Sequence, residues 1–169
     1  MIILRFVYDP GLITNLITFD SDEPGGYCHV EAVMPGGKYL GAHVTGVEER
    51  PMNYDAGKFV RQKFVLLPAT VGQTEKWAHY LRATVGEPYD FSAIAGFVSH
   101  LDLNQKHHVI CSALQTLALR WCEYLPVPLP VPAHRISVRD LELGLAMRPD
   151  AREIAMDDPV FVGHVSANG

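Results

Sequence analysis

Two short runs near the N-terminus alternate between apolar and polar side chains with the period of two that is typical of β-strands. The runs are 27–34 and 38–44, and Pro35-Gly36-Gly37 separates them. Two such runs joined by a short loop with glycine predict a β-hairpin. A further strand is expected at 1–9, where the chain is mostly apolar.

The two faces of this hairpin differ in character. In each strand one face is small and apolar, and the opposite face is polar. The apolar faces coincide if the loop has three residues, so that Met34 pairs with Lys38. The same register places His29 opposite His43, with Glu31 on the same face. Two histidines and a carboxylate then share one surface, and the alternative interpretation is a solvated outer face without chemistry.

Helical periodicity begins at Cys111. The apolar residues that recur after it at helical spacing are Leu114, Ala118, Trp121, Cys122 and Leu125. Cys111 is therefore expected in the first turn, where unpaired backbone N–H groups and the helix dipole favour an anion. A thiol at such a position ionises more easily, and the thiolate is the nucleophile. The alternative is a small buried hydrophobe at the head of an apolar face.

Start signals predict several further elements. Asp9-Pro10 is typical of a helix start, Thr70 and Gln73 fit a capping box, and Ser137 fits an N-cap. The predicted helices are 10–19, 70–85, 91–98 and 137–147. The other predictions are a strand at 58–67, an extended Pro-rich connector at 126–132, a last strand at 160–165 and irregular chain at 45–58.

The composition is that of a single globular domain over residues 1–169. Charged residues make up 20% of the chain, and the net charge of −5 argues against a nucleic-acid partner. No stretch approaches the ~18 apolar residues of a membrane span. No signal peptide is recognised, so a cytoplasmic location is expected. Cys28, Cys111 and Cys122 are too few for a disulfide framework, and Cys28 and Cys122 are expected to be buried.

Two kinds of chemistry use these residue types. A cysteine nucleophile needs a base within hydrogen-bond reach, and the base needs a third group to hold its tautomer. Zinc is the alternative, and the ligands available for it are Cys28, His29, His43, His107, His108 and Cys111. The chain has no Cys-x-x-Cys pair, and Val109-Ile110 is typical of a strand or entry loop. No metal and no cofactor are therefore predicted.

Three segments together carry a family resemblance. They are Tyr27-Cys28-His29-Val30-Glu31-Ala32-Val33 with the later Gly36-Gly37, Gly41-Ala42 and Gly46-Val47, then Gly86-Glu87-Pro88-Tyr89-Asp90-Phe91, and then Ile110-Cys111-Ser112-Ala113-Leu114. They resemble, in turn, the histidine hairpin, the Gly-x-x-Tyr-Asp segment and the Cys-Ser-Glu-Leu signature of the circularly permuted NlpC-type papain-like cysteine peptidases. Ala113 replaces the usual Glu. The order of histidine before cysteine is what permutation implies.

This resemblance implies an α+β, papain-like fold, in which a small antiparallel sheet packs against the helix that starts at the nucleophile. It implies Cys111 as nucleophile and His29 as base. The residue that orients His29 is either Glu31, which fits a His-x-Glu pattern, or His43, which resembles the second histidine of the related lecithin retinol acyltransferase-like proteins. Cross-strand geometry favours His43. A carboxylate would also stabilise the imidazolium, which favours Glu31.

The implied activity is that of a cysteine hydrolase, either a peptidase or amidase or an acyl hydrolase, that works through an acyl-enzyme. Its substrate would be a peptide, a cell-wall peptide or an acyl ester. The alternative is a non-catalytic binding or accessory protein, bacterial or from a phage, that uses the same cleft.

Overall fold

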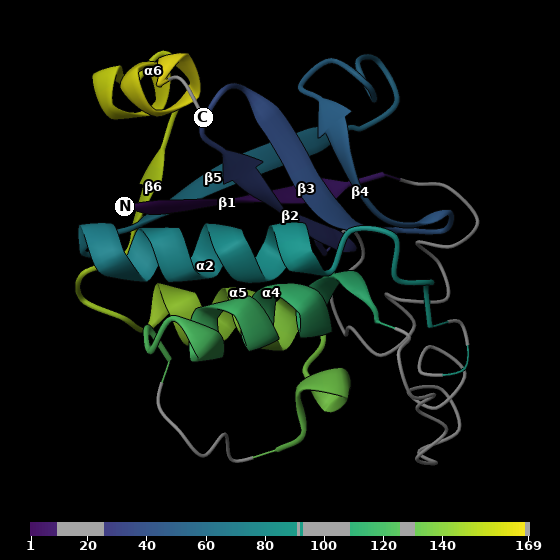
Figure 1. Ribbon diagram of the computed structural model, residues 1–169. Coiled ribbons are helices and arrows are strands. Elements are labelled where there is room, and N and C mark those ends of the chain that lie inside the picture. Colours follow the sequence, from purple (N-terminus) through teal and green to yellow (C-terminus); the bar gives the residue numbers. More distant parts are fainter. Residues whose placement is uncertain (10–25, 91, 93–108, 126–130, 168–169) are drawn as a thin grey trace.

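A six-stranded antiparallel β-sheet forms the middle of the fold (Figure 1). The computed structural model describes residues 1–9, 26–90, 92, 109–125 and 131–167. The strands are β1 (Ile2–Tyr8), β2 (His29–Met34), β3 (Lys38–His43), β4 (Gly46–Pro51), β5 (Arg61–Leu67) and β6 (Arg152–Ile154). They are hydrogen-bonded in the order β4-β3-β2-β1-β5-β6, so the hairpin β2–β3 lies beside the N-terminal strand.

Helices cover both faces of this sheet. They are α2 (Val71–Ala83), α4 (Cys111–Trp121), α5 (Val138–Ala146) and α6 (Pro159–Ser166), with a 3-10 helix η1 at Ala133–Arg135. Figure 1 shows α2, α4 and α5 on one side of the sheet, and α6 on the other side near the C-terminus. The predicted α+β class is confirmed, and the sheet is larger than the hairpin alone indicates.

Side-chain alternation along the strands divides the core into two clusters. The larger cluster lies between the sheet and the helices α2, α4 and α5, and it includes Phe6, Trp77 and Leu114. The smaller cluster lies on the α6 side and includes Ile3 and Phe161. Phe6 is fully buried, and full burial of such a side chain stabilises the fold by about 1.5–3 kcal/mol.

The β2–β3 hairpin has the predicted three-residue loop. Met34 pairs with Lys38, and the pairing continues to Ala32 and Leu40. Both glycines of the loop have positive φ, at 90° and 75°, a conformation that favours glycine. Beyond Ala32 and Leu40 the ladder stops, so the predicted pairing does not continue as far as the two histidines.

The predicted starts of two helices are confirmed. Thr70 and Gln73 form the capping box of α2, and Ser137 with Asp140 forms that of α5. The predicted strands at 1–9 and 58–67 correspond to β1 and β5. The predicted helices at 10–19 and 91–98, apart from Ser92, lie outside the described residues, as does most of the connector at 126–132.

The prediction of irregular chain at 45–58 is wrong for β4. This strand pairs with β3 from His43 opposite Gly46 to Lys38 opposite Pro51. Gly46 and Pro51 lie at its two ends, and Val47 is its one buried hydrophobic residue. An edge strand with a single apolar anchor has too little alternation to be recognised from the sequence.

The prediction of a strand at 160–165 is also wrong, because these residues belong to α6. The Asp158 side chain accepts a hydrogen bond of 2.8 Å from the Val160 N–H group, and Pro159 occupies the start of the helix. An N-cap followed by Pro is a helix start, and here it outweighs the β-branched residues that follow.

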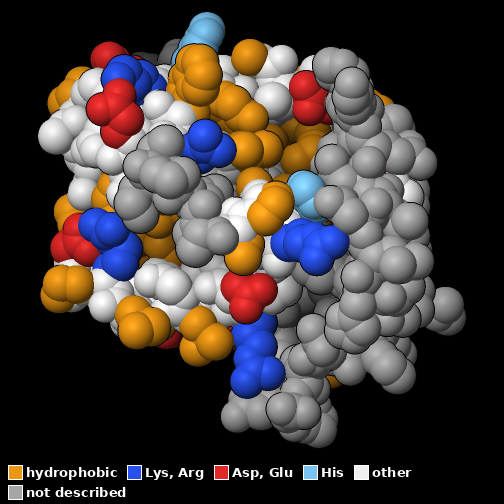
Figure 2. All heavy atoms as spheres, turned by 90° about the horizontal axis from the view of Figure 1, so that it is seen from below, with side chains coloured by type: hydrophobic (Ala, Val, Ile, Leu, Met, Phe, Trp, Pro, Cys, Tyr) orange, Lys and Arg blue, Asp and Glu red, His pale blue; other side chains and the backbone are white. Residues whose placement is uncertain are grey.

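The surface on the helical side carries no dominant charge. Figure 2 shows hydrophobic side chains there, between charged ones of both signs, and neither sign forms a continuous patch among the described residues. Among the helices of the described ranges, none has both the length and the apolar character needed to cross a membrane.

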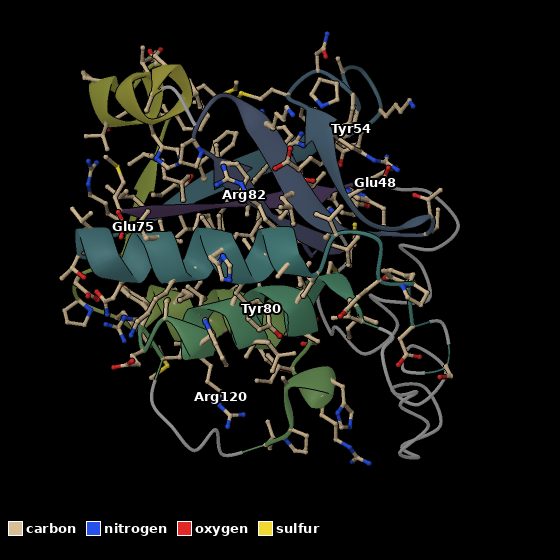
Figure 3. The ribbon with its side chains drawn as sticks, viewed as in Figure 1. Glu48, Tyr54, Glu75, Tyr80, Arg82 and Arg120 are labelled. Carbon is tan, nitrogen blue, oxygen red and sulfur yellow. The ribbon has the colours of Figure 1, made fainter. Side chains whose placement is uncertain are left out.

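Two residues of α2, Tyr80 and Arg82, which Figure 3 labels, contact neighbouring elements. Arg82 Nε lies 3.8 Å from a carboxylate oxygen of Glu49 on β4, which links this helix to the edge of the sheet. The ring of Tyr80 lies 5.8 Å from that of Trp121, which links α2 to α4. These contacts link α2 to the edge of the sheet and to α4.

The start of α6 provides a test of the fold. Replacing Asp158 with Ala removes the N-cap and should lower the free energy of unfolding by about 1 kcal/mol. Chemical denaturation measures the change. The control is Ala at the exposed neighbour Asp157, which should leave stability within ~0.5 kcal/mol of the parent. Equal effects of the two substitutions would contradict the assigned cap.

Candidate functional site

The first turn of α4 lies where β2 and β3 separate. The ladder between these strands ends at Ala32 and Leu40. The Gln115 side chain of α4 donates a hydrogen bond of 3.2 Å to the Leu40 carbonyl. The Val30 N–H group of β2 donates to the sulfur of Cys111. Residues of α4 therefore form hydrogen bonds with both β2 and β3 at the point where the pairing of these strands ends.

Cys111 and His29 lie within hydrogen-bond reach of each other. Burial alone would raise the pKa of the Cys111 thiol. The charge and hydrogen bond of His29, and the N–H groups of Val30 and Ser112, lower it overall. Burial alone would lower the pKa of His29, yet the Cys111 thiolate and then Glu31 raise it to about 10. The arrangement therefore favours a thiolate beside an imidazolium.

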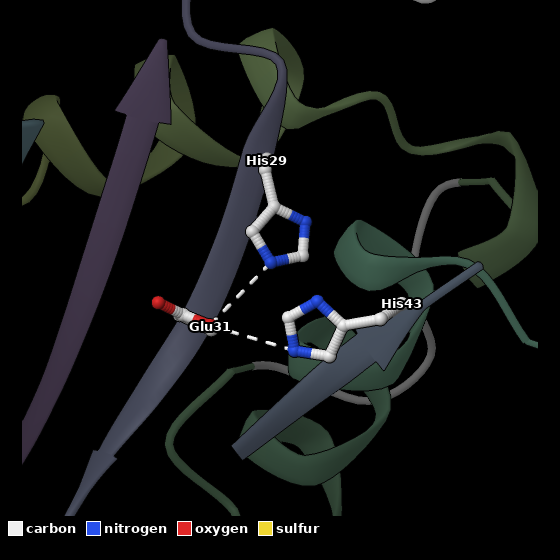
Figure 4. A group of neighbouring side chains, drawn as sticks. All are labelled: His29, Glu31 and His43. Carbon is white, nitrogen blue, oxygen red and sulfur yellow. Dashed lines mark ion pairs between the residues drawn. The ribbon is translucent and has the colours of Figure 1, made fainter. Parts of the chain in front are cut away.

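Glu31 faces the Nε2 atom of His29 (Figure 4). Its Oε2 atom is 3.5 Å from His29 Nε2 and 3.7 Å from His43 Nε2. One carboxylate oxygen therefore faces both histidines. Because His29 Nε2 faces Glu31, Nδ1 is the ring nitrogen that remains for the thiol.

His43 is the second histidine of the site. Its ring centroid lies 4.9 Å from that of His29. Burial, and then the positive charge of His29, lower the pKa of His43 to about 3. His43 is therefore neutral at neutral pH, whereas Glu31 is charged. Of the two candidates for orienting His29, Glu31 is the one whose charge favours an imidazolium.

Glu31 is held in place by a buried ion pair. Its side chain is 0% exposed, and its Oε1 atom lies 2.6 Å from Arg5 Nη1. The Tyr54 hydroxyl donates to Oε2 at 3.2 Å. Arg5 also pairs with Asp55 at 2.9 Å and donates from Nε to Gln62 at 2.6 Å. Arg5 thus fixes one oxygen of the carboxylate, and the other faces Tyr54 and the two histidines.

The charge state of Glu31 follows from these contacts. Burial alone would raise its pKa, but the hydrogen bond and charge of His29, and then those of Arg5, lower it. Tyr54 stays protonated because burial and the negative charges of Glu31 and Asp55 raise its pKa. Glu31 is consequently an acceptor and Tyr54 a donor at neutral pH.

Gly41 provides the space that Glu31 occupies. A Cβ atom at residue 41 would lie 2.9 Å from the Glu31 Cβ and 3.5 Å from His43 Nε2. A gap of 2.9 Å is below any normal carbon–carbon contact, so one of the two side chains would have to move. The absence of a side chain on β3 here lets the carboxylate stand between the histidines.

The same three residues also form a potential metal-binding group. One ligand atom each from His29, Glu31 and His43 lie within 4.8 Å of one another. Cys28 and Cys111, both proposed above as zinc ligands, are not part of this group. His107 and His108 lie outside the described residues. The donor set is two imidazoles and a carboxylate, which suits zinc.

The structure brings together all four site residues predicted from the sequence, namely Cys111, His29, Glu31 and His43. Cys28 and Cys122 are buried, as predicted, and none of the three cysteines forms a disulfide. Tyr89 of the Gly-x-x-Tyr-Asp segment forms a parallel bridge with Val109. Burial and then the Cys111 thiolate raise the pKa of its hydroxyl.

Sequence reasoning missed the residues that support Glu31. Arg5 is a single charged residue within an otherwise apolar strand, and a charge there needs a buried partner. That signal indicates a partner without identifying it. Asp55 and Tyr54 lie in a segment with no strand or helix pattern, and the sequence does not place them behind the hairpin.

Comparisons with known proteins concern the fold. No protein-family model matches the sequence, and no curated protein matches it at a significant level. The crystal structure of the metalloprotein yiiX from Escherichia coli O157:H7, DUF1105, is similar to this chain with a TM-score of 0.62. The similarity covers 90% of this chain and 94% of that chain at 16% sequence identity. It supports the α+β fold, whereas the papain-like assignment stays a prediction.

The space at residue 41 gives a test of the site geometry. Gly41→Ala should displace Glu31 and lower the rate of Cys111 alkylation, with a loss of stability of about 1–3 kcal/mol from overpacking. The matched control is Gly144→Ala in α5, where a Cβ atom meets nothing within 4 Å. That substitution should leave alkylation unchanged and slightly raise stability. Normal alkylation in Gly41→Ala protein would contradict the role given to Glu31.

Proposed function

We propose that this protein is a cysteine hydrolase of the circularly permuted NlpC type, in which Cys111 is the nucleophile and His29 is the general base and acid. The observation that carries the proposal is the juxtaposition of Cys111 with His29, whose far ring nitrogen faces the buried carboxylate of Glu31. Nucleophile, base and orienting group are thus adjacent in the order that a cysteine hydrolase requires.

The first half of the reaction forms an acyl-enzyme. The Cys111 thiolate attacks the substrate carbonyl carbon, and the electron pair of the carbonyl bond moves onto its oxygen. The unpaired backbone N–H groups of the first turn of α4 would be the donors available to this oxyanion. As the tetrahedral species collapses, His29 transfers its Nδ1 proton to the leaving amine or alcohol.

The second half releases the acyl group. Neutral His29 accepts a proton from water, and the resulting hydroxide attacks the thioester carbonyl carbon. The carbon–sulfur bond breaks, and Cys111 leaves as the thiolate beside the reformed imidazolium. Glu31 stays ionised throughout, where it stabilises the imidazolium through Nε2. Arg5 keeps Glu31 in that orientation.

The substrate class follows from this chemistry and from the family resemblance. The candidates are a peptide or amide bond, including one in a cell-wall peptide, and an acyl ester. Cys111 is 2% exposed and the His29 side chain 20% exposed. The sulfur of Cys111 is therefore covered, and access of a substrate to it requires a local opening.

Metal chemistry has to be considered, since the structural neighbour yiiX is described as a metalloprotein. In this chain the residues that would hold an ion are His29, Glu31 and His43, and they fit one, because the Nε2 atoms of both histidines have no hydrogen-bond partner among the described residues. Such an ion would supply a positive charge at His29 Nε2 in place of a proton. The acyl-enzyme route uses these residues without it.

The second candidate function is a non-catalytic binding or accessory protein built on the same fold. The near-complete burial of Cys111 favours it, because a nucleophile must be reached by its substrate. This alternative predicts that the three cysteines differ little in their reactivity toward small thiol reagents.

Reaction with a small thiol reagent separates the two functions. Iodoacetamide at neutral pH should label Cys111 in preference to the other cysteines, because its thiol pKa is lowered while burial raises that of Cys122. Mass spectrometry of the peptides locates the label. Cys111→Ser should abolish labelling and any esterase or amidase turnover, whereas Cys28→Ser should retain both. Uniformly slow labelling would favour the binding protein.

The pH dependence of the same reaction tests the orienting residue. The lowered thiol pKa means that alkylation should already be fast below the usual range for cysteine, and should slow as the thiolate is protonated at lower pH. Glu31→Gln removes the charge that supports the imidazolium, so the midpoint should move to higher pH. His43→Gln should move it less, because His43 is neutral. The reverse order would assign the orienting role to His43.

A further inference from the structure

We infer that His29, Glu31 and His43 form a site for a divalent transition-metal ion, Zn²⁺ in the first instance, and that metal binding and catalysis by His29 exclude each other. The inhibitory part of this inference rests on the proposed hydrolase function, whereas the binding part does not.

The first argument is the state of the two histidine nitrogens. Nε2 of His29 and Nε2 of His43 are buried and have no hydrogen-bond partner among the described residues. A buried polar atom without a partner costs about 1–3 kcal/mol. Both atoms face the same carboxylate oxygen, so a single bound group could satisfy both. A metal ion is such a group, because it accepts a lone pair from each neutral imidazole.

The second argument is the spacing of the donor atoms. The distances from Glu31 Oε2 to the two Nε2 atoms are 3.5 and 3.7 Å, longer than the ~2.7–3.2 Å of an N–H···O hydrogen bond. Tetrahedral zinc with bonds of about 2.0–2.2 Å sets neighbouring ligand atoms roughly 3.3–3.6 Å apart. The two carboxylate–imidazole distances are close to the spacing of neighbouring zinc ligands, and the ligand atoms of all three residues lie within 4.8 Å of one another.

The third argument is the support around the ligands. Arg5 holds Oε1 of Glu31 at 2.6 Å, and Tyr54 donates to Oε2 at 3.2 Å, so the ligating carboxylate is already oriented. His29 has its other ring nitrogen toward Cys111. A metal-bound histidine usually donates its second N–H group to an anionic or polar partner. The thiolate of Cys111 provides that acceptor without joining the ligand sphere.

The charges of the site are compatible with a divalent cation. Arg5 contributes one positive charge, and Glu31 and Asp55 contribute two negative charges, all within one ion-pair network. With a thiolate at Cys111, these groups sum to −2. A divalent ion between the histidines would neutralise the network, and this requires His29 and His43 to be neutral.

Metal binding and catalysis compete for one atom. In the hydrolase, His29 Nε2 keeps a proton that faces Glu31 while Nδ1 gives up and regains its proton, so Nε2 has no lone pair for a metal. With zinc on Nε2, Glu31 can no longer stabilise the imidazolium form of His29. His29 then cannot give up and regain its Nδ1 proton as the reaction requires. His43, which the proposed reaction does not require as acid or base, then has a function as the additional metal ligand.

Metal titration of the chelator-treated full chain tests the site. One equivalent of Co²⁺ should bind and give the visible absorption of a four-coordinate ion, and calorimetry should show one Zn²⁺ site. His43→Gln should weaken binding about tenfold or more. His79→Gln, at an exposed histidine of α2, is the matched control and should bind as the parent does. Equal affinities for the two variants would overturn the proposed site, as would no binding to the parent.

X-ray absorption of the zinc-loaded parent protein makes the test independent of any variant. The expected first shell contains nitrogen and oxygen with two imidazoles, and a zinc–sulfur distance of about 2.3 Å would overturn the ligand set. If the hydrolase proposal also holds, one equivalent of Zn²⁺ should lower turnover about 100-fold, and a chelator should restore it. Unchanged turnover with zinc bound would overturn the competition. Zinc binding to a protein whose Cys111 is unreactive without metal would overturn the hydrolase and leave the metal site standing.

Discussion

The buried ion pair between Arg5 and Glu31 is the interaction on which the rest of the site depends. Glu31 is completely buried, and a carboxylate in that position is tolerated only if it is paired and hydrogen-bonded. Arg5 supplies the pair, and Asp55 and Gln62 fix the guanidinium in turn. Leaving either charge without its partner should cost about 3–5 kcal/mol. The network therefore stabilises the fold and, by the same contacts, aims one oxygen of Glu31 at the histidines.

The second constraint is the separation of β2 from β3. The first turn of α4 lies beside the point where the pairing of these strands ends. Because the ladder ends at Ala32 and Leu40, Cys111 reaches the backbone of Val30 and the side chain of His29. Gly41 completes this arrangement on β3, since a side chain there would displace Glu31. The site thus lies where pairing between β2 and β3 ends and where residues of α4 form hydrogen bonds with these two strands.

Much of this was accessible from the sequence because local patterns determine it. Alternation and a three-residue loop define the hairpin register, and that register puts His29, Glu31 and His43 on one surface. The helix at Cys111, the capping box of α2 and the N-cap of α5 follow from periodicity and start signals. The sequence does not reveal β4 or α6, since β4 has one apolar anchor and α6 is rich in β-branched residues. It also does not reveal that Arg5 meets Glu31 and Asp55, because such long-range pairing leaves no local pattern.

The central claim is that Glu31, held by Arg5, keeps His29 protonated beside a thiolate at Cys111. Nitrogen-15 NMR of the histidine rings in metal-free protein reads the protonation state of His29 directly. The account predicts that His29 keeps both ring protons well above the usual pKa range of histidine, consistent with a pKa raised to about 10, and that Cys111→Ala returns its titration toward lower pH. A His29 ring that titrates within the usual range of histidine in both proteins would contradict the account.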